Sequence, residues 1–377
     1  MLSSDIKNAA LVLENGKIFL GYGIGYPRTV SGEVVFTTGM VGYLRSLTDP
    51  SYYGQILVFT YPLIGNYGVP NPDLRDKWGL PKFFESDGIK VRGVVVFECC
   101  KNPSHWSSYM SLDEWLKKEK VPGIEGIDTR ELTLILREKG TMLGILDVRP
   151  PGSEPDIDGL LSKIAKIKDP NEENLVSQVS ISDPIELGYG RFKIVLIDCG
   201  VKYNILRCLL NRGVKITRVP WNWTAEEILE LKPDGVVISN GPGDPRMVPE
   251  TVETTRALID EGVPMLGICL GNQLIALACG AKTFKLKYGH RGLNKPVIDL
   301  KTLKSFVTSQ NHGYAVDISS IPPELEVSYI NADDKTVEGL IHLRKHCLSV
   351  QFHPEHNPGP WDAEWIFDYF LSLIRRD

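Results

Sequence analysis

The sequence has 377 residues, 42% of them hydrophobic and 24% charged, with a formal net charge of -5. This length allows two domains, each with a sizeable core, and the composition is that of an ordinary soluble globular protein. The mild charge and the lack of lysine and arginine runs interleaved with aromatic residues exclude nucleic acid as an expected partner.

Two further features of composition bear on the cellular location. No run of about 18 apolar residues occurs, and residues 1–5 contain no basic segment that leads into an apolar one, so no membrane partner is expected. The seven cysteines are odd in number and show no C-x-x-C spacing, which predicts neither a disulfide framework nor a zinc site. We therefore expect a cytoplasmic protein with reduced thiols and no metal.

Residues 1–150 are predicted to form a smaller, β-rich α/β domain. The glycines at 21, 23 and 25 lack the helix and the βαβ setting of a dinucleotide-binding loop, so we expect them to serve turns. Residues 39–68 are dense in Gly, Pro, Asn and Tyr, which fits either turns in a compact domain or a shaped binding surface. Strands are predicted at 10–13, 18–20, 33–37 and 91–97, and helices at 111–118 and 128–138.

Residues 151–190 are rich in Pro, Gly and Asp and are predicted to connect the domains. Regular alternation of strands and helices then fills residues 191–377, which predicts a doubly wound, mostly parallel sheet of the α/β class. Ligands bind such sheets at the carboxyl ends of the strands. Strands are predicted at 193–197, 215–219, 235–239, 263–268 and 348–352, and helices at 157–167, 204–210, 225–231, 249–260 and 272–279.

The strongest chemical signal is Cys269, which stands between Gly267 and Gly271 where the apolar run 263–268 meets a helical pattern. This is the pattern of a nucleophile elbow with cysteine in place of serine, since a sharp strand-to-helix turn needs small neighbours. The free N–H groups at the start of the helix would favour a thiolate. The alternative is that Cys269 only fills core volume, as most free cysteines do.

The end of the strand at 348–352 favours the chemical interpretation, because it runs into His353-Pro354-Glu355. In extended backbone, side chains two residues apart point the same way, so Glu355 can orient His353 as a base. The turn at 240–243 follows the strand at 235–239. If that strand lies beside the strand leading to Cys269, the N–H groups of Gly241 and Leu270 can hold a developing oxyanion.

At this point the residues resemble a known family. The runs GICLGNQ at 267–273, NGPG at 240–243 and HPE at 353–355 are similar to those of the triad-type, class I glutamine amidotransferases. The runs TDPSY at 48–52, YPLIGNYG at 61–68, IDTR at 127–130 and REKG at 137–140 resemble the small subunit of carbamoyl-phosphate synthetase, as do GHRG at 289–292 and QNHGY at 310–314. The likeness covers nearly the whole chain.

The resemblance implies that the chain hydrolyses L-glutamine and that the ammonia passes to a separate large subunit. That partner would use ATP, magnesium and bicarbonate to make carbamoyl phosphate for pyrimidine and arginine synthesis, and this chain would hold no cofactor. Cys269 would be the nucleophile, His353 the base and Glu355 its orienter, with Gly241 and Leu270 as the oxyanion hole. The residues implied to hold the amino acid portion of glutamine are Ser51, Gly243, Gln273, Asn311, Gly313 and Tyr314.

Two positions depart from the family pattern, which often has His where this chain has Asn272 and Phe where it has Tyr314. Neither side chain is needed for acyl transfer, so the implied mechanism stands. Three alternatives remain open: the glutaminase of another amidotransferase, an unrelated cysteine hydrolase, and a non-catalytic scaffold for the large subunit. An intact set of Cys, His and Glu argues against the scaffold.

Overall fold

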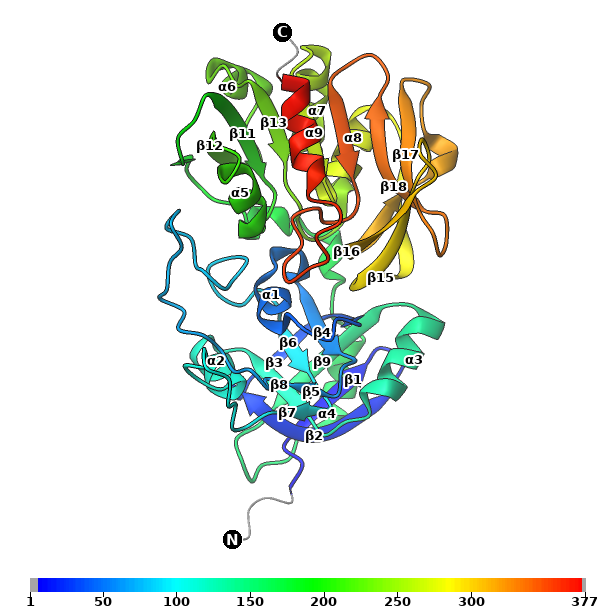
Figure 1. Ribbon diagram of the computed structural model, residues 1–377. Helices are drawn as coiled ribbons and strands as arrows, with labels where there is room; N and C mark the ends of the chain where they lie inside the picture. Colours follow the sequence, from blue (N-terminus) through cyan, green and yellow to red (C-terminus); the bar gives the residue numbers. More distant parts are fainter. Residues whose placement is uncertain (1–5, 375–377) are drawn as a thin grey trace. The chain divides into compact units, whose positions relative to one another are not determined.

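A computed structural model describes residues 6–374 and divides the chain into two units, Met1–Glu173 and Asn174–Asp377 (Figure 1). Residues 1–5, which entered the expectation about location, lie outside the described residues. Within 6–374, no helix combines the length and the apolar character that crossing a membrane requires.

The first unit is built around a closed β-barrel, which agrees with the β-rich α/β domain expected there. Strand β1 shows why the barrel is stable: its five residues are all buried, with alternate side chains facing the barrel interior or helix α4 (Ile157–Ile164). The barrel strands in spatial order are β1 (Ala9–Leu13), β2 (Ile18–Gly25), β8 (Pro122–Glu125), β6 (Gly93–Val95), β4 (Gln55–Phe59), β3 (Thr29–Thr37) and β9 (Met142–Val148).

The expectation that the glycines at 21, 23 and 25 serve turns is wrong for this barrel, because all three lie within strand β2. A Cβ atom on Gly21 would lie 2.4 Å from the backbone oxygen of Glu125, on the paired strand β8. Glycine here permits close approach between strands rather than a change of chain direction.

Residues 39–68 contain two short helical segments and two strands, which are joined by turns. The helices of this unit cover the barrel. Asp128 caps the longest of these helices by accepting from the backbone N–H of Glu131, as its spacing predicts. The remaining elements of this unit are α1 (Tyr43–Thr48), η1 (Pro50–Tyr52), β5 (Leu63–Ile64), β7 (Glu98–Cys99), α2 (Leu112–Lys118), α3 (Thr129–Lys139), α4 (Ile157–Ile164) and η2 (Pro170–Glu172).

The second unit contains a ten-stranded sheet. Its central strands β12, β11, β13, β14 and β19 are parallel, so the predicted α/β class is confirmed. The sequence did not predict that β18, β17, β15 and β16 extend the sheet with antiparallel pairing. In spatial order the strands are β10 (Ile185–Leu187), β12 (Val214–Pro220), β11 (Phe192–Asp198), β13 (Gly235–Ile238), β14 (Met265–Ile268), β19 (Cys347–Val350), β18 (Val337–His342), β17 (Leu325–Asn331), β15 (Thr283–Asp299) and β16 (Ser305–Val316).

Helices cover both faces of the parallel strands. One face carries α6 (Ala225–Glu230), α7 (Pro249–Asp260) and α8 (Leu270–Ala278), whose apolar side chains share a core with β11, β13 and β14. The other face carries α5 (Tyr203–Leu210) and α9 (Trp365–Ile374), which lie in front of the sheet in Figure 1. This is the doubly wound arrangement that the alternation predicts.

The predicted connection at 151–190 is shared between the two units. Its helix α4 contacts β1 and β9 of the barrel, whereas β10 pairs with β12 of the large sheet. The division between the units falls at 173/174. A short helical turn, η3 (Val176–Gln178), follows that point and contributes Val176 to the core of the second unit.

The close contact between α8 and β13 yields a stability prediction. A Cβ atom on Gly271 would lie 2.3 Å from the backbone oxygen of Ile238, so Gly271→Ala must push the helix off the sheet. We expect a loss of about 1–3 kcal/mol in the free energy of unfolding, measured by urea denaturation. The matched control is Glu253→Ala on the exposed face of α7. Equal stability of the two variants would contradict the close packing.

Candidate active site

Four neighbouring parallel strands end on one edge of the sheet in the second unit. Each strand is followed by a segment that carries a residue of the candidate active site. Strand β11 leads to Lys202, β13 to Gly241, β14 to Cys269 and β19 to His353. The pairing on which the oxyanion prediction depended is present, since β13 and β14 run parallel. The carboxyl ends of these strands therefore gather their side chains in one place, as doubly wound sheets do.

Cys269 occupies a strained turn between β14 and α8. Its backbone has φ 56 and ψ -100, a conformation that side-chain-bearing residues rarely adopt, and its N–H donates to the oxygen of Val350 at 2.8 Å. A Cβ atom on Gly267 would lie 2.5 Å from the oxygen of Gly271, so the flanking position needs glycine. The helix starts directly after Cys269 rather than at residue 272 as predicted, because the whole change of direction occurs at Cys269.

His353 and Glu355 lie just beyond β19 and contact each other. The Nδ1 atom of His353 is 2.7 Å from Oε1 of Glu355, and a carboxylate can only accept, so Nδ1 carries the proton. Lys202 Nζ lies 2.8 Å from the same carboxylate oxygen. Asn204 Nδ2 donates to the backbone oxygen of Glu355 at 2.5 Å. The Nε2 atom of His353 is thereby left for chemistry with Cys269.

Burial and charge act against each other on this pair. Burial alone disfavours the imidazolium, but the Glu355 carboxylate outweighs it and, with help from Cys269, raises the pKa of His353 to about 10. Lys202 opposes that increase. Burial likewise disfavours the charged Glu355, yet Lys202 and His353 hold the pKa of Glu355 well below its usual range. The site therefore carries a buried imidazolium and carboxylate together.

The two predicted oxyanion donors lie close together. A Cβ atom on Gly241 would lie 2.7 Å from Cδ2 of Leu270 and 2.2 Å from the oxygen of Cys199, so glycine lets this turn reach the start of α8. Leu270 is the first residue of α8, and the N–H groups of a first turn have no partner within their own helix. Both backbone donors thus lie beside the cysteine.

Strand β16 brings further predicted residues to the cysteine. The thiol of Cys269 is 3.7 Å from the backbone oxygen of Asn311, and Gln273 Nε2 donates to the backbone oxygen of Tyr314 at 2.8 Å. Gly313 lies between Asn311 and Tyr314 on the same strand. These four predicted residues therefore belong to one neighbourhood with Cys269.

The other two predicted substrate-binding residues, Gly243 and Ser51, lie on other segments of the chain. Gly243 follows β13 with φ 83, and a Cβ atom there would lie nearest to Leu175. Ser51 lies in η1 of the first unit, where its N–H donates to Oδ1 of Asp49 at 2.9 Å. The assignment of both residues to glutamine binding stays a prediction from the resemblance.

Sequence reasoning missed Gln351, whose Nε2 lies 3.7 Å from the sulfur of Cys269. Its Oε1 accepts from Asn272 Nδ2 at 3.0 Å and from Gln273 Nε2 at 3.1 Å, which fixes the orientation of the amide. The position of Asn272, where the family often has His, is thus occupied by a buried, hydrogen-bonded amide. Alternation along the strand could have revealed Gln351, because residues 351 and 353 point the same way.

Sequence reasoning also missed Lys202, which lies far from the HPE motif in the chain. Its side chain is only 7% exposed, and a lysine is rarely so buried unless it is paired. The one available signal was its place a few residues beyond a predicted strand of the parallel sheet, in the segment that follows β11. That position alone does not reveal which carboxylate the lysine reaches.

Comparison with known proteins agrees with this geometry. Residues 11–146 match the family described as carbamoyl-phosphate synthase small chain, CPSase domain, and residues 195–373 match glutamine amidotransferase class-I. A carbamoyl phosphate synthase small chain from Archaeoglobus fulgidus is 50% identical, covering 97% of this chain and 99% of that protein. The one from Methanopyrus kandleri is 48% identical with the same coverage.

A third relative is the multifunctional protein CAD of Squalus acanthias, which is 49% identical over 97% of this chain but only 16% of its own length. The resemblance inferred from the motifs is therefore confirmed over almost the whole sequence. The chain belongs to the family of carbamoyl-phosphate synthase small chains.

Proposed function

We propose that this chain is the glutamine-hydrolysing subunit of a carbamoyl-phosphate synthase, which converts L-glutamine and water to L-glutamate and ammonia. The observation that carries the proposal is the meeting of Cys269, the His353–Glu355 pair and two backbone donors at adjacent strand ends. Such a set performs acyl transfer through a covalent intermediate. Membership of the family narrows the substrate to glutamine.

In the first half of the reaction, the sulfur of Cys269 attacks the carboxamide carbon of glutamine. The N–H groups of Gly241 and Leu270 hold the oxyanion that forms. The C–N bond then breaks, and His353 gives the proton on Nε2 to the departing nitrogen, which leaves as ammonia. A glutamyl thioester on Cys269 remains.

In the second half, His353 accepts a proton from a water molecule, whose oxygen attacks the thioester carbon. The C–S bond breaks, glutamate leaves, and the thiolate and imidazolium are restored. Glu355 keeps the imidazole oriented throughout, because Nδ1 stays bonded to its carboxylate. Lys202 balances the buried carboxylate when the imidazole is neutral.

The amino acid portion of the substrate is assigned from the resemblance to Ser51, Gly243, Gln273, Asn311, Gly313 and Tyr314. The contacts of Asn311 and Gln273 around Cys269 support this assignment for the second unit. The assignment of Ser51 to glutamine binding is supported by the run TDPSY at 48–52, which matches the family.

Ammonia can act as a nucleophile in a further reaction only as the free base, because the ammonium ion that forms in bulk water has no free lone pair. We therefore propose a large-subunit partner that receives ammonia through an enclosed path and uses ATP, magnesium and bicarbonate to make carbamoyl phosphate. The product would serve pyrimidine and arginine synthesis. The sequence contains no Gly-x-x-x-x-Gly-Lys-Ser/Thr motif, which agrees with nucleotide chemistry on the partner.

Replacing the nucleophile tests the division of labour. Cys269→Ser introduces a far less acidic nucleophile of nearly the same shape, so glutamine hydrolysis should fall by orders of magnitude. The complex with the large subunit should still make carbamoyl phosphate from added ammonium salt. Cys279→Ser, at the far end of α8, is the matched control and should keep both activities. Retained glutamine-dependent synthesis in Cys269→Ser, or hydrolysis of a generic peptide by the unmodified chain, would refute the proposal.

The electrostatics of His353 yield a prediction about pH. Because Glu355 helps to hold the pKa of His353 near about 10, the imidazolium persists into alkaline solution. Glu355→Gln removes that carboxylate and keeps the charge of Lys202, so the pKa of His353 should fall. The alkaline limb of the kcat profile should move to lower pH, with a smaller loss of kcat than in Cys269→Ser.

The control for this experiment is Glu364→Gln, which changes a partly exposed carboxylate that pairs with Arg212. Its pH profile should match that of the unmodified chain. An unchanged profile in Glu355→Gln would remove the carboxylate from its assigned position beside His353.

A further inference from the structure

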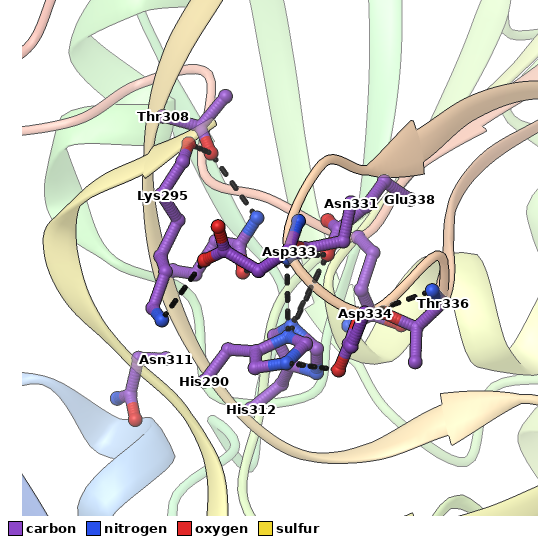
Figure 2. Close-up of polar contacts among 12 residues, drawn as sticks. His290, Lys295, Thr308, Asn311, His312, Asn331, Asp333, Asp334, Thr336 and Glu338 are labelled. Carbon is purple, nitrogen blue, oxygen red and sulfur yellow. Dashed lines mark hydrogen bonds and ion pairs between the residues drawn. The ribbon is translucent and has the colours of Figure 1, made fainter. Parts of the chain in front are cut away.

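A second polar cluster lies in the antiparallel part of the sheet and takes no part in the mechanism above. His290 on β15 and His312 on β16 are directly paired across the two strands, and Glu338 on β18 faces both. One ligand atom from each of the three residues lies within 4.8 Å of the others, and all three residues are buried. Figure 2 shows the two imidazole rings and the carboxylate converging.

The hydrogen bonds of His312 define which of its nitrogens faces the cluster. Nδ1 lies 2.8 Å from the backbone oxygen of Tyr314, and a carbonyl can only accept, so Nδ1 carries the proton. In the neutral ring the other nitrogen, Nε2, is therefore unprotonated. Nε2 therefore presents a lone pair, and it has no hydrogen-bond partner among residues 6–374.

His290 has the same arrangement with its nitrogens exchanged. Nε2 lies 2.8 Å from Oδ2 of Asp334, which orients the ring and fixes Nε2 as the protonated atom of the neutral form. Nδ1 then faces the cluster, 3.7 Å from Oε1 of Glu338 and 3.5 Å from Nδ2 of Asn331, which also contacts that carboxylate oxygen. Histidines that bind metals usually donate their other ring N–H to a carboxylate or a backbone carbonyl in this way.

Glu338 places its carboxylate beside His290 Nδ1 and His312 Nε2. The three residues thus bring three potential metal-binding atoms together. Glu338 is fully buried, its Oε1 accepts from Asn331 Nδ2 at 3.0 Å, and its Oε2 has no hydrogen-bond partner in the part of the chain that the structure describes. Nε2 of His312 lies 3.9 Å from Oε1 of Glu338, beyond hydrogen-bonding distance. A buried carboxylate is costly unless positive charge lies beside it, which either a metal ion or a proton on an imidazole supplies.

We propose that His290 Nδ1, His312 Nε2 and the Glu338 carboxylate bind a zinc-class divalent cation. Two imidazoles and one carboxylate are donors that Zn²⁺ accepts, with a water molecule in the fourth tetrahedral position. Bond lengths of about 2.0–2.1 Å place tetrahedral ligands roughly 3.3–3.5 Å apart. Oε1 of Glu338 lies 3.7 and 3.9 Å from the two nitrogens, and the three ligand atoms lie within 4.8 Å of one another. Binding a metal ion would therefore draw these atoms together by up to about 1.5 Å.

The competing occupant of the space is a proton on His290 Nδ1. The carboxylates of Asp334 and Glu338, 2.8 and 3.7 Å from the two ring nitrogens, would stabilise that proton. The positive charge of Arg291 also acts on His312 and disfavours a second cation nearby. Proton and metal thus compete for one site, and metal uptake should release a proton.

The bound ion would be structural, because it fixes β15, β16 and β18 to one another behind the segment 311–314. It does not touch the reacting atoms. The proposal also stands whether or not the chain hydrolyses glutamine, since metal content is measured without any substrate.

The test uses the full chain, purified without a metal-binding tag, and measures zinc by mass spectrometry of the elements. After treatment with chelator, Zn²⁺ is titrated calorimetrically and Co²⁺ is followed by its visible absorption. We expect one metal ion per chain, tetrahedral Co²⁺ bands, and a higher thermal unfolding midpoint with zinc. His312→Asn and Glu338→Gln should weaken binding by at least about tenfold.

The matched controls are His342→Asn at the end of β18 and Glu326→Gln on the exposed side of β17, and both should bind the metal normally. If Glu338→Gln fails to fold, the Co²⁺ spectrum and the metal stoichiometry of the unmodified chain still show whether the chain binds a metal ion. Failure of the unmodified chain to take up either metal, equal uptake by Glu338→Gln, or an equal loss in the controls would overturn the proposal and leave the proton as the occupant.

Discussion

The strained backbone at Cys269 is the constraint around which the second unit is organised. A residue held at φ 56 costs about 1–3 kcal/mol, so its surroundings must fix it in place. They do so through the hydrogen bond to Val350 and through glycines on both sides, which let β13, β14 and α8 come closer than any side chain would allow. The parallel strands beside it then bring their own carboxyl ends to the sulfur.

A second constraint is the burial of charge beside that sulfur. Glu355 is fully buried, and one of its oxygens contacts both Lys202 and His353. Removing a carboxylate from water is costly unless positive partners lie within hydrogen-bonding distance. Two partners on one oxygen mean that the carboxylate remains paired when the imidazole gives up its proton. The lysine therefore allows His353 to act as acid and base without leaving an isolated buried charge.

Local patterns predicted the parts of the site that depend on neighbouring residues. The elbow follows from glycines on either side of Cys269, the pairing of His353 with Glu355 from their spacing, and the order of elements from regular alternation. Lys202 and the antiparallel strands β15 to β18 were not predicted, because they depend on which distant segments pair and in what register. The role of the glycines in β2 could not be predicted for the same reason, because the local sequence does not indicate that β8 packs closely against them.

The antiparallel strands also join the two polar regions of this unit. The backbone oxygen of Tyr314 accepts from Gln273 Nε2 and from His312 Nδ1, both at 2.8 Å, using both of its lone pairs. Gln273 in turn donates to Gln351, whose amide faces the sulfur of Cys269. The orientation of the His312 ring is therefore connected through two shared acceptors to the polar groups around the nucleophile. Whichever cation fills the space beside Glu338, it acts on the geometry of strand β16 rather than on the bonds that break.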